Sequence, residues 1–406
     1  MKLKCAAKRA ADGSLFWRFV RSLASHPQQI VPLARAEYRR RIGIAQERRK
    51  QPCTIGPPIN VSINLTRRCN LRCEMCIQHR HDRDGASTLS WYDSRRELPV
   101  ADWVRLLDAI VDFRPTLYVT GGEPMLHAGF EDFIRAAKQR RLFLHLATNG
   151  ILLERHAALL VDSGVEIVTI SLDGTAAIHD RIRGQRGLFD QTVAGIRALV
   201  ATRRARGRSM PIVGLNFVIS QTSLAAIADM VPLAVDLDAD FLQFQHTIFS
   251  TPDCVARHNR LFSTEFAASR GIQLQAPSIP PGEFYEGGIA DEHIPLLISA
   301  LEGAKLQAKG LIKLSFLPNL SPAMIQPYYR DLEYPFGGRC DTPWKTLRIL
   351  PDGTVMPCLH VVAGNIREQS IDAIWNGPTM QNYRTLIAEK LLPACARCCN
   401  RTFVPA

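Results

Sequence analysis

The chain of 406 residues is 46% hydrophobic and 22% charged, a composition ordinary for globular proteins that excludes a largely disordered chain. Its net charge is +12, but residues 1–50 alone hold 13 Lys or Arg against three acids, a surplus of +10, so the remainder is nearly neutral. No stretch of about 20 uncharged apolar residues occurs and no apolar signal-peptide segment follows Met1, so we expect neither a transmembrane helix nor a signal peptide.

The basic arm, residues 1–55, comes first. Between Leu15 and Ile44 it mixes apolar residues with arginines, including Arg39, Arg40 and Arg41, a pattern compatible with an amphipathic helix. Such a helix is able to rest on an anionic membrane surface or to contact an acidic partner. The alternative is a solvated arm that packs on the catalytic domain.

Strand and helix patterns then alternate from residue 59 to about residue 250. Six β-rich runs with helical segments between them indicate β–α units with a parallel sheet. The predicted strands are Ile59–Leu65, Thr116–Thr120, Leu142–Ala147, Glu166–Leu172, Ile212–Ile219 and Phe241–Gln245. The predicted helices lie near residues 101–113, 129–140, 152–163, 189–206 and 223–235.

Six such units are too few for a closed eight-stranded barrel. We therefore predict an α/β fold, a partial (β/α)6 TIM-like barrel followed by a small C-terminal α+β iron–sulfur domain, with functional groups on the loops after the strands. The expected divisions are the extension (1–55), the barrel (56–250), a linker with a helix near 291–309 (251–339) and the small module (340–406).

The 11 cysteines fall into two groups. Three lie between Cys69 and Cys76 and five between Cys340 and Cys399, while Cys5, Cys53 and Cys254 are scattered. Cluster-binding thiolates need a reducing compartment, so we expect a cytoplasmic protein. Cys254 is a weak candidate for a hydrogen-atom donor or substrate-binding thiol, with an incidental buried thiol as the alternative.

Cys69, Cys73 and Cys76 form a CxxxCxxC loop directly after the first predicted strand. Three thiolates bind three irons of a four-iron cluster and leave the fourth iron open to another ligand. Zinc is one alternative, and because a closed zinc site needs a fourth ligand, His79 or His81 would have to supply it. Spare thiols are the other alternative.

This loop resembles the defining motif of the radical S-adenosylmethionine (SAM) superfamily, and the resemblance extends over about residues 59–245. It implies a [4Fe–4S] cluster whose open iron binds SAM, and reductive cleavage of SAM to a 5′-deoxyadenosyl radical. Gly121, Gly122, Glu123 and Pro124 match the family's GGEP segment, which is expected to hold the SAM amino group through its backbone and its Glu. One departure is Met75, where the family usually has an aromatic residue.

Polar residues also follow the third and fourth predicted strands. The resemblance places Asn149, Ser171 and Asp173 near the SAM ribose, whose hydroxyls suit amide, hydroxyl and carboxylate partners. It further suggests Arg183 as a partner of the SAM carboxylate, with Arg181 as a competing candidate. The alternative for all of them is an ordinary turn or surface-loop residue.

The C-terminal cysteines have the spacing C-x12-G-x4-C followed by CxxC. Cys340, Cys358, Cys395 and Cys398 resemble the ligands of a twitch or shortened SPASM domain, which carries one auxiliary [4Fe–4S] cluster, with Cys399 as an alternative to Cys398. Structural zinc and a cluster with an iron open to substrate are further alternatives. Asp352–Gly353 is expected to form a hairpin turn between strands Thr346–Leu350 and Thr354–Pro357.

The resemblance implies a radical SAM oxidoreductase or maturase that abstracts hydrogen from a small metabolite or a peptide, with an auxiliary cluster accepting an electron in an oxidative outcome. Redox-neutral epimerisation or rearrangement is one alternative, and RNA modification is another. The chemistry implies a flavodoxin- or ferredoxin-type electron donor. We do not expect nucleic-acid binding, because the basic arm has few interleaved aromatic residues and no RNA-binding module is evident.

Overall fold

The computed structural model describes residues 30–50, 54–76, 96–274, 287–358 and 361–405. The strands of this part of the chain form a single sheet in the order β10-β9-β8-β1-β2-β3-β4-β5-β6-β7. Their bounds are β1 Asn60–Thr66, β2 Thr116–Gly121, β3 Phe143–Thr148, β4 Ile167–Ser171, β5 Ile212–Ile219, β6 Phe241–His246, β7 Lys313–Leu317, β8 Thr346–Ile349, β9 Thr354–Val355 and β10 Gly364–Asn365.

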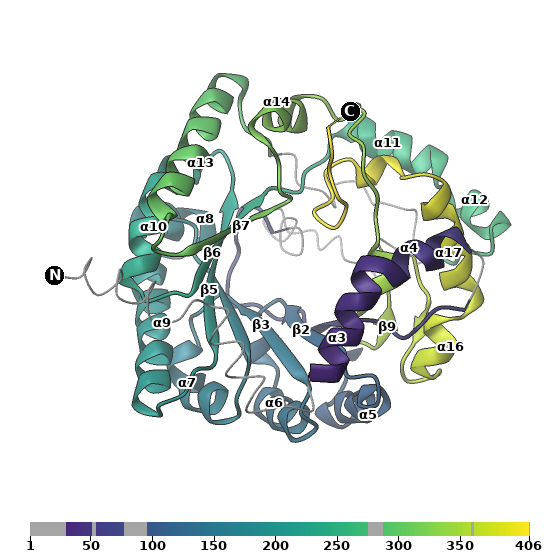
Figure 1. The fold of residues 1–406 in the computed structure, drawn as a ribbon, viewed down its shortest axis with the longest axis horizontal. Helices are drawn as coiled ribbons and strands as arrows, with labels where there is room; N and C mark the ends of the chain where they lie inside the picture. Colours follow the sequence, from purple (N-terminus) through teal and green to yellow (C-terminus); the bar gives the residue numbers. More distant parts are fainter. Residues whose placement is uncertain (1–29, 51–53, 77–95, 275–286, 359–360, 406) are drawn as a thin grey trace.

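Helices surround this sheet (Figure 1). Those of the barrel are α5 Val100–Ile110, α6 Phe130–Gln139, α7 Leu153–Asp162, α8 Ala176–Arg183, α9 Leu188–Ala205, α10 Ile227–Asp236 and α13 Ile294–Ala308. The others are α3 Ile30–Tyr38, η2 Arg39–Gly43, α4 Ile44–Arg49, α11 Pro252–Leu261, α12 Thr264–Ser269, α14 Pro322–Arg330, α15 Thr342–Lys345, α16 Ile371–Trp375 and α17 Pro378–Glu389. Short η helices lie at Pro124–Leu126 (η5), Leu224–Ala226 (η6), Asp291–His293 (η7) and Pro393–Cys395 (η8).

The predicted partial TIM-like barrel is confirmed. Each of the six predicted strands overlaps one of β1 to β6, and the five predicted helices overlap α5, α6, α7, α9 and α10. Strands β1 to β7 pair in parallel in chain order, and the strand order is linear, so the barrel stays open between its two edges (Figure 1).

Two further strands join the parallel part of the sheet. Strand β7, inside the segment expected to be a linker, pairs in parallel with β6, and β8 of the C-terminal module pairs in parallel with β1. The prediction of six units missed this extension, because β7 is a short, half-buried edge strand whose sequence has little apolar alternation. The expected helix near 291–309 is α13, and the predicted hairpin is β8–β9, with Ile349 paired to Val355.

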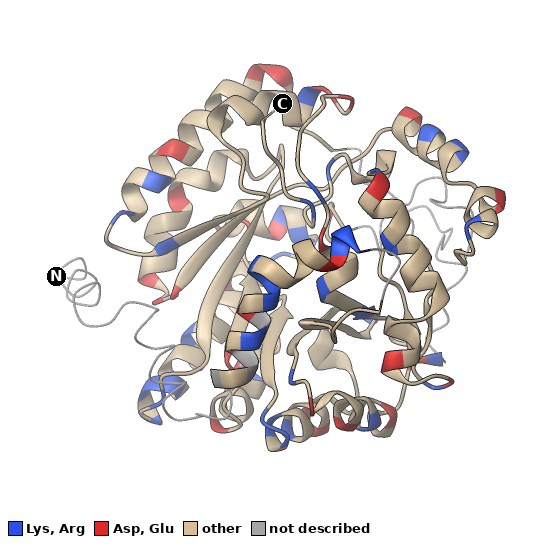
Figure 2. Cartoon of the chain, turned by 45° about the vertical axis from the view of Figure 1, so that its right-hand side comes forward, with Lys and Arg blue, Asp and Glu red and all other residues tan. Residues whose placement is uncertain are grey.

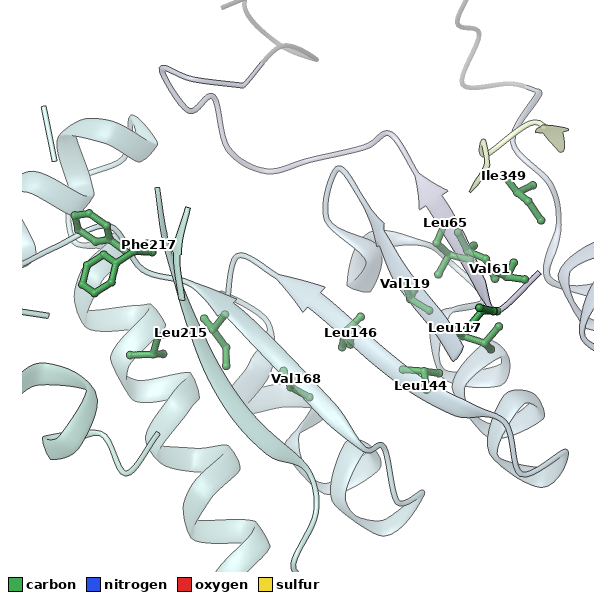
Figure 3. Packing of buried hydrophobic residues seen from close by; sticks show 14 of the residues in the cluster. Val61, Leu65, Leu117, Val119, Leu144, Leu146, Val168, Leu215, Phe217 and Ile349 are labelled. Atoms are coloured by element: carbon green, nitrogen blue, oxygen red, sulfur yellow. The ribbon is translucent and has the colours of Figure 1, made fainter. Parts of the chain in front are cut away.

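The core lies between the outer face of the sheet and the helices. Alternate residues of each strand, such as Val61, Ile63 and Leu65 of β1, are fully buried, as expected for the period of two in a strand. Figure 3 shows their counterparts Leu117, Val119, Leu144 and Leu146 on the adjoining strands. The inner face of the same strands carries mostly polar side chains, so we expect the functional site on the inside of the barrel.

The described part of the basic arm packs on the C-terminal module (Figure 2). Arg39 donates hydrogen bonds to Glu47 at 3.0 Å and to the Trp344 carbonyl at 3.1 Å, and Arg48 donates to the Cys340 carbonyl at 2.7 Å. On its other side the arm exposes Tyr38 and Ile42. Residues 15–29 of the predicted amphipathic segment lie outside the described residues. Among the helices described, none is both long and apolar enough to cross a membrane.

Candidate active site

The cysteine loop leaves β1 at the carboxyl end of the strand and is fastened to α8. Glu74 donates its backbone N–H to the Ile182 carbonyl at 2.9 Å, and Cys76 N–H closes a turn onto Cys73 O at 3.1 Å. Cys73, Cys76 and Glu123 lie near the Cys69 thiol: burial raises the pKa of Cys69 to about 11, and these three groups also act to raise it. Metal binding displaces such protons, because iron takes the thiolate.

The glycines of the Gly121–Pro124 segment let the end of β2 approach the chain before Cys69. Gly121 has φ +138°, and a Cβ there would lie 2.2 Å from Thr66 O; a Cβ on Gly122 would lie 2.4 Å from Arg68 O. The N–H groups of Gly122 and Glu123 donate to the same two carbonyls, each at 2.8 Å. Any side chain would separate these segments, so glycine is required for close approach.

Glu123 is fully buried, and its carboxylate is occupied by protein donors. It accepts hydrogen bonds from the Thr148 hydroxyl at 3.0 Å, from Asn149 N–H at 2.8 Å and from Met125 N–H at 3.2 Å. Burial raises its pKa to about 7, although these bonds act in the opposite direction. The carboxylate therefore braces the ends of β2 and β3, and the contact of this segment with the SAM amino group stays a prediction.

Asn149 connects the end of β3 to the cysteine loop. The side-chain NH2 group of Asn149 donates to Asn70 Oδ1 at 2.8 Å, and Asn149 Oδ1 accepts from Ile151 N–H at 3.1 Å. Ser171, also expected near the ribose, is half-buried at the end of β4 and lies beside Asn216 in the sheet register. The structure thus gathers Asn149 with the loop and places Ser171 on the inner wall.

Arg183, and not Arg181, reaches the cysteine loop. Its Nε donates to Asp173 Oδ2 at 2.6 Å, and its Nη1 donates to the Cys73 sulfur at 3.7 Å, whereas Arg181 is exposed. Burial acts to lower the pKa of Arg183, but Asp173 and the Cys73 thiolate outweigh it and raise this pKa.

Asp173, predicted as a ribose contact, has its carboxylate hydrogen-bonded within the protein, and the ribose contact stays a prediction. Asp173 is fully buried, pairs with Arg183 through Oδ2 and accepts from Val218 N–H of β5 at 2.9 Å through Oδ1. Helix α8, which presents Arg183, was not predicted. A surface loop was only one alternative for its polar sequence, and the buried face of the helix is evident only from packing.

The C-terminal thiols form a second group. Burial raises the pKa of Cys395 well above its ordinary value, and Cys358, Cys398 and Cys340 add to the rise. Burial likewise raises the pKa of Cys398 to about 12. Cys399 lies near Arg348 and Tyr118 on the barrel wall, and also near Tyr328 and the neighbouring Cys398. The geometry therefore favours Cys398 as the fourth thiol of this group.

The two thiol groups lie at opposite ends of the barrel. Strands β1 and β8 are parallel neighbours; Cys69 follows the end of β1, whereas Cys340 precedes the start of β8. The antiparallel β9 carries the chain back, so that Cys358 returns to the side of Cys340. The inner space of the barrel consequently lies between the two groups.

The donor sets fit iron–sulfur clusters. Zinc needs its ligands around one point, and across the described ranges no three His, Cys, Asp or Glu side chains are grouped to hold a single ion. A four-iron cluster takes its thiolates on separate irons, so its thiols stand farther apart. His79 and His81, the nearby candidates for zinc, lie outside the described residues.

Cys254 lies away from the cysteine loop. It sits in α11, is 4% exposed and directs its sulfur toward the Pro393 carbonyl at 3.5 Å. This position under the C-terminal segment matches the alternative of an incidental buried thiol.

Polar side chains that the sequence interpretation did not single out line the inner wall. On β5 to β7, Gln243 donates to Asn216 Oδ1 at 2.8 Å, and Ser315 donates to Gln243 Oε1 at 3.4 Å. On β3 and β4, His145 Nε2 lies 2.7 Å from Thr169 Oγ1. The signal was present in the sequence as polar residues at every second position of otherwise apolar strands.

Comparison with known proteins accords with this geometry. The family model described as the radical SAM superfamily matches residues 63–217, and the model described as an iron–sulfur cluster-binding domain, SPASM, matches residues 340–399. The PqqA peptide cyclase of Ruegeria pomeroyi is 27% identical over 360 residues, covering 86% of this chain and 81% of that protein. The tungsten-containing aldehyde ferredoxin oxidoreductase cofactor-modifying protein of Pyrococcus furiosus is 25% identical over 363 residues, covering 84% of this chain and 86% of that protein.

Among solved structures, Streptococcus suis SuiB bound to S-adenosylmethionine matches with a TM-score of 0.58 at 15% identity, covering 82% of this chain and 68% of that chain. At this identity the match shows a shared fold. The two matched domains imply a [4Fe–4S] cluster with SAM in the barrel and auxiliary iron–sulfur binding at the C-terminus. With both domains in order on one partial barrel, the chain carries a radical SAM domain at residues 63–217 and a C-terminal SPASM domain at residues 340–399.

Proposed function

We propose that this protein is a radical SAM enzyme that oxidises a peptide inside its barrel. Cys69, Cys73 and Cys76 hold the SAM-binding cluster, and Cys340, Cys358, Cys395 and Cys398 hold the auxiliary cluster. When bound, the first cluster and SAM supply one-electron cleavage of SAM, which yields a 5′-deoxyadenosyl radical able to remove a hydrogen atom from carbon.

The observation that carries this proposal is the placement of two thiol groups at opposite ends of one polar barrel interior. A substrate bound between them has a hydrogen-abstracting site on one side and an electron acceptor on the other. Loss of one hydrogen atom to the radical, and of one further electron and proton, leaves a product lighter by two hydrogen atoms. An oxidative reaction would therefore use the hydrogen-abstracting site at one end of the barrel and the electron acceptor at the other.

The chain's own residues hold the reacting parts in place. The Asn149–Asn70 bond and the Arg183–Cys73 contact fix the cysteine loop against β3 and α8. The Gly121 and Gly122 backbone holds the end of β2 close to Thr66 and Arg68, directly before the cysteine loop. Side-chain amides on β5 and β6 offer donors and acceptors that match a peptide backbone.

A peptide is the substrate class we favour, because a PqqA peptide cyclase is similar over most of both chains. The similarity to a cofactor-modifying protein of comparable coverage makes a small metabolite the second candidate. A flavodoxin- or ferredoxin-type donor would supply the electron. Contact of the basic arm with an anionic membrane surface is a further proposal, compatible with the exposed Tyr38 and Ile42.

Mass spectrometry tests the proposal. Purified protein with both clusters is incubated without oxygen with SAM, a reductant and short peptides encoded beside its gene. We expect a peptide product lighter by two hydrogen atoms and an equal amount of 5′-deoxyadenosine. A modified peptide of unchanged mass would contradict the oxidative outcome, and modification of a non-peptide metabolite alone would contradict the substrate class.

A further inference from the structure

Four side chains lie in a row across neighbouring parallel strands. In the sheet register, Arg348 of β8 lies beside Ser62 of β1, Ser62 beside Tyr118 of β2, and Tyr118 beside His145 of β3. Each alternates with buried residues that face the helices, so all four belong to the inner wall. We call Arg348, Ser62, Tyr118 and His145 the inner row.

The inner row borders open space. Tyr118 is 38% exposed although β2 is paired on both sides and covered by helices on its outer face. Its ring meets the His145 ring edge-on with centroids 5.0 Å apart. Arg348 and His145 are half-buried. Exposure in the middle of a paired sheet means that this space lies inside the barrel.

Arg348 has no acidic partner among the described residues. Two buried arginines of the barrel pair with carboxylates, Arg183 with Asp173 and Arg203 with Asp240. Two others, Arg384 and Arg397, donate to backbone carbonyls and lie over aromatic rings. Arg348 makes no such contact within the described part of the chain. The Tyr118 hydroxyl and the Cys399 thiol both lie near Arg348. A partly desolvated guanidinium without an anion is costly, and its planar fork matches a carboxylate in two parallel hydrogen bonds.

We propose that Arg348, assisted by the Tyr118 hydroxyl, binds a carboxylate of the peptide substrate. This inference rests on the proposed function, because it takes the barrel interior as the peptide site. The inner row lies on strands whose opposite ends adjoin the two thiol groups, so a carboxylate at Arg348 orients the substrate between them. The side-chain amides of Asn216 and Gln243, on β5 and β6, would then hydrogen-bond the peptide backbone.

Peptide selection tests this binding site without turnover. Full-length protein loaded with its clusters and SAM, but given no reductant, is used to select from a random library of 12-residue peptides with amidated C-termini. We expect the wild type to enrich peptides that contain Asp or Glu, and Arg348→Gln to lose that enrichment. Arg155→Gln, which changes an exposed arginine on α7, is the matched control and should retain it.

A binding measurement then quantifies the contact. For one selected peptide, Glu→Gln in the peptide and Arg348→Gln in the protein should each weaken binding about tenfold or more, and the double change should weaken it little further. Arg348→Lys keeps the positive charge but cannot form two parallel hydrogen bonds to a carboxylate, so its affinity for the peptide should lie between those of the wild type and Arg348→Gln.

Two results would overturn the inference: acidic enrichment that Arg348→Gln retains, or a wild type that selects no acidic residues. A second library with free C-termini distinguishes a side-chain carboxylate from the terminal one. Because the selection needs no catalysis, a protein that selects acidic peptides and yet fails to modify them would contradict the proposed function and leave this site standing.

Discussion

The guanidinium of Arg183 donates a hydrogen bond to the sulfur of Cys73 at 3.7 Å. Asp173 holds the guanidinium in place from the other side, and Val218 N–H in turn holds Asp173. A chain of contacts therefore runs from β5 to a proposed cluster ligand. Hydrogen bonds and positive charge at cluster sulfurs stabilise the reduced state.

Removal of this contact should lower the reduction potential of the SAM-binding cluster. For Arg183→Gln we expect a decrease on the order of 50 mV, near the size of a tenfold change in a one-electron equilibrium. Redox titration followed by electron paramagnetic resonance measures it, with exposed Arg181→Gln as the control. Arg183→Lys should recover part of the potential. An unchanged potential in a folded Arg183→Gln protein would show that the contact has no electronic effect.

Replacement of Glu123 by Gln should destabilise the protein. Thr148, Asn149 and Met125 donate to the two oxygens of the carboxylate. Glutamine has only one side-chain oxygen, so some of these donors would lose their acceptor and would face the new NH2 group. We expect the free energy of unfolding to fall by about 1–3 kcal/mol, as measured by urea denaturation without oxygen. Glu131→Gln, at an exposed position of α6, is the control. Equal stability of Glu123→Gln and wild type would mean that the carboxylate is not the brace described above.

Acid should destabilise the fold through its buried histidines. Burial lowers the pKa of His246 to about 3, and burial together with Arg183 lowers that of His179 to about 4. The unfolded chain takes up a proton at each histidine below about pH 6.5 while the folded protein does not, so stability falls with pH by about 1.4 kcal/mol per unit per histidine.

Urea denaturation at pH 7 and pH 5 measures this loss. His246→Gln should show a smaller loss than wild type, by about 2 kcal/mol, whereas His293→Gln should not differ from it. If wild type and His246→Gln lose the same stability between these two values, His246 is not protonated on unfolding as described.

The auxiliary site should depend on Cys398 and not on Cys399. Cys398 adjoins the Cys395 thiol, whereas Cys399 lies near Arg348 and Tyr118. Iron analysis of the reconstituted protein should therefore give about four fewer irons for Cys398→Ala than for wild type, and no loss for Cys399→Ala. The reverse pattern would assign the ligand to Cys399.

The barrel was predictable from sequence because β1 to β6 bury one face in strict alternation, and the loops that follow them carry recognisable cysteines and glycines. The strand β7 escaped prediction because an edge strand that is half-buried needs little apolar periodicity. The pairing of β8 with β1 joins residues nearly 300 positions apart, and no local pattern encodes it.

Residue roles were less predictable than residue locations. Glu123 and Asp173 lie at the expected strand ends, and Arg183 lies on the unpredicted helix α8. Their hydrogen-bond partners include protein groups of Thr148, Val218 and Cys73, which the sequence did not indicate. A charged side chain in a motif can contact a ligand or brace the loop that holds it, and the choice depends on burial. Arg348, which forms no ion pair with any described residue, shows the converse, since only the register of the sheet places it on the inner wall.

Formation of 5′-deoxyadenosine tests the central claim most directly. Wild-type protein reconstituted without oxygen, then given reductant and SAM, should release 5′-deoxyadenosine and methionine, and Cys69→Ala, Cys73→Ala and Cys76→Ala should each release none while keeping the C-terminal cluster. Equal amounts of 5′-deoxyadenosine from wild type and these variants, or none from a wild type that contains its four-iron cluster, would contradict the account.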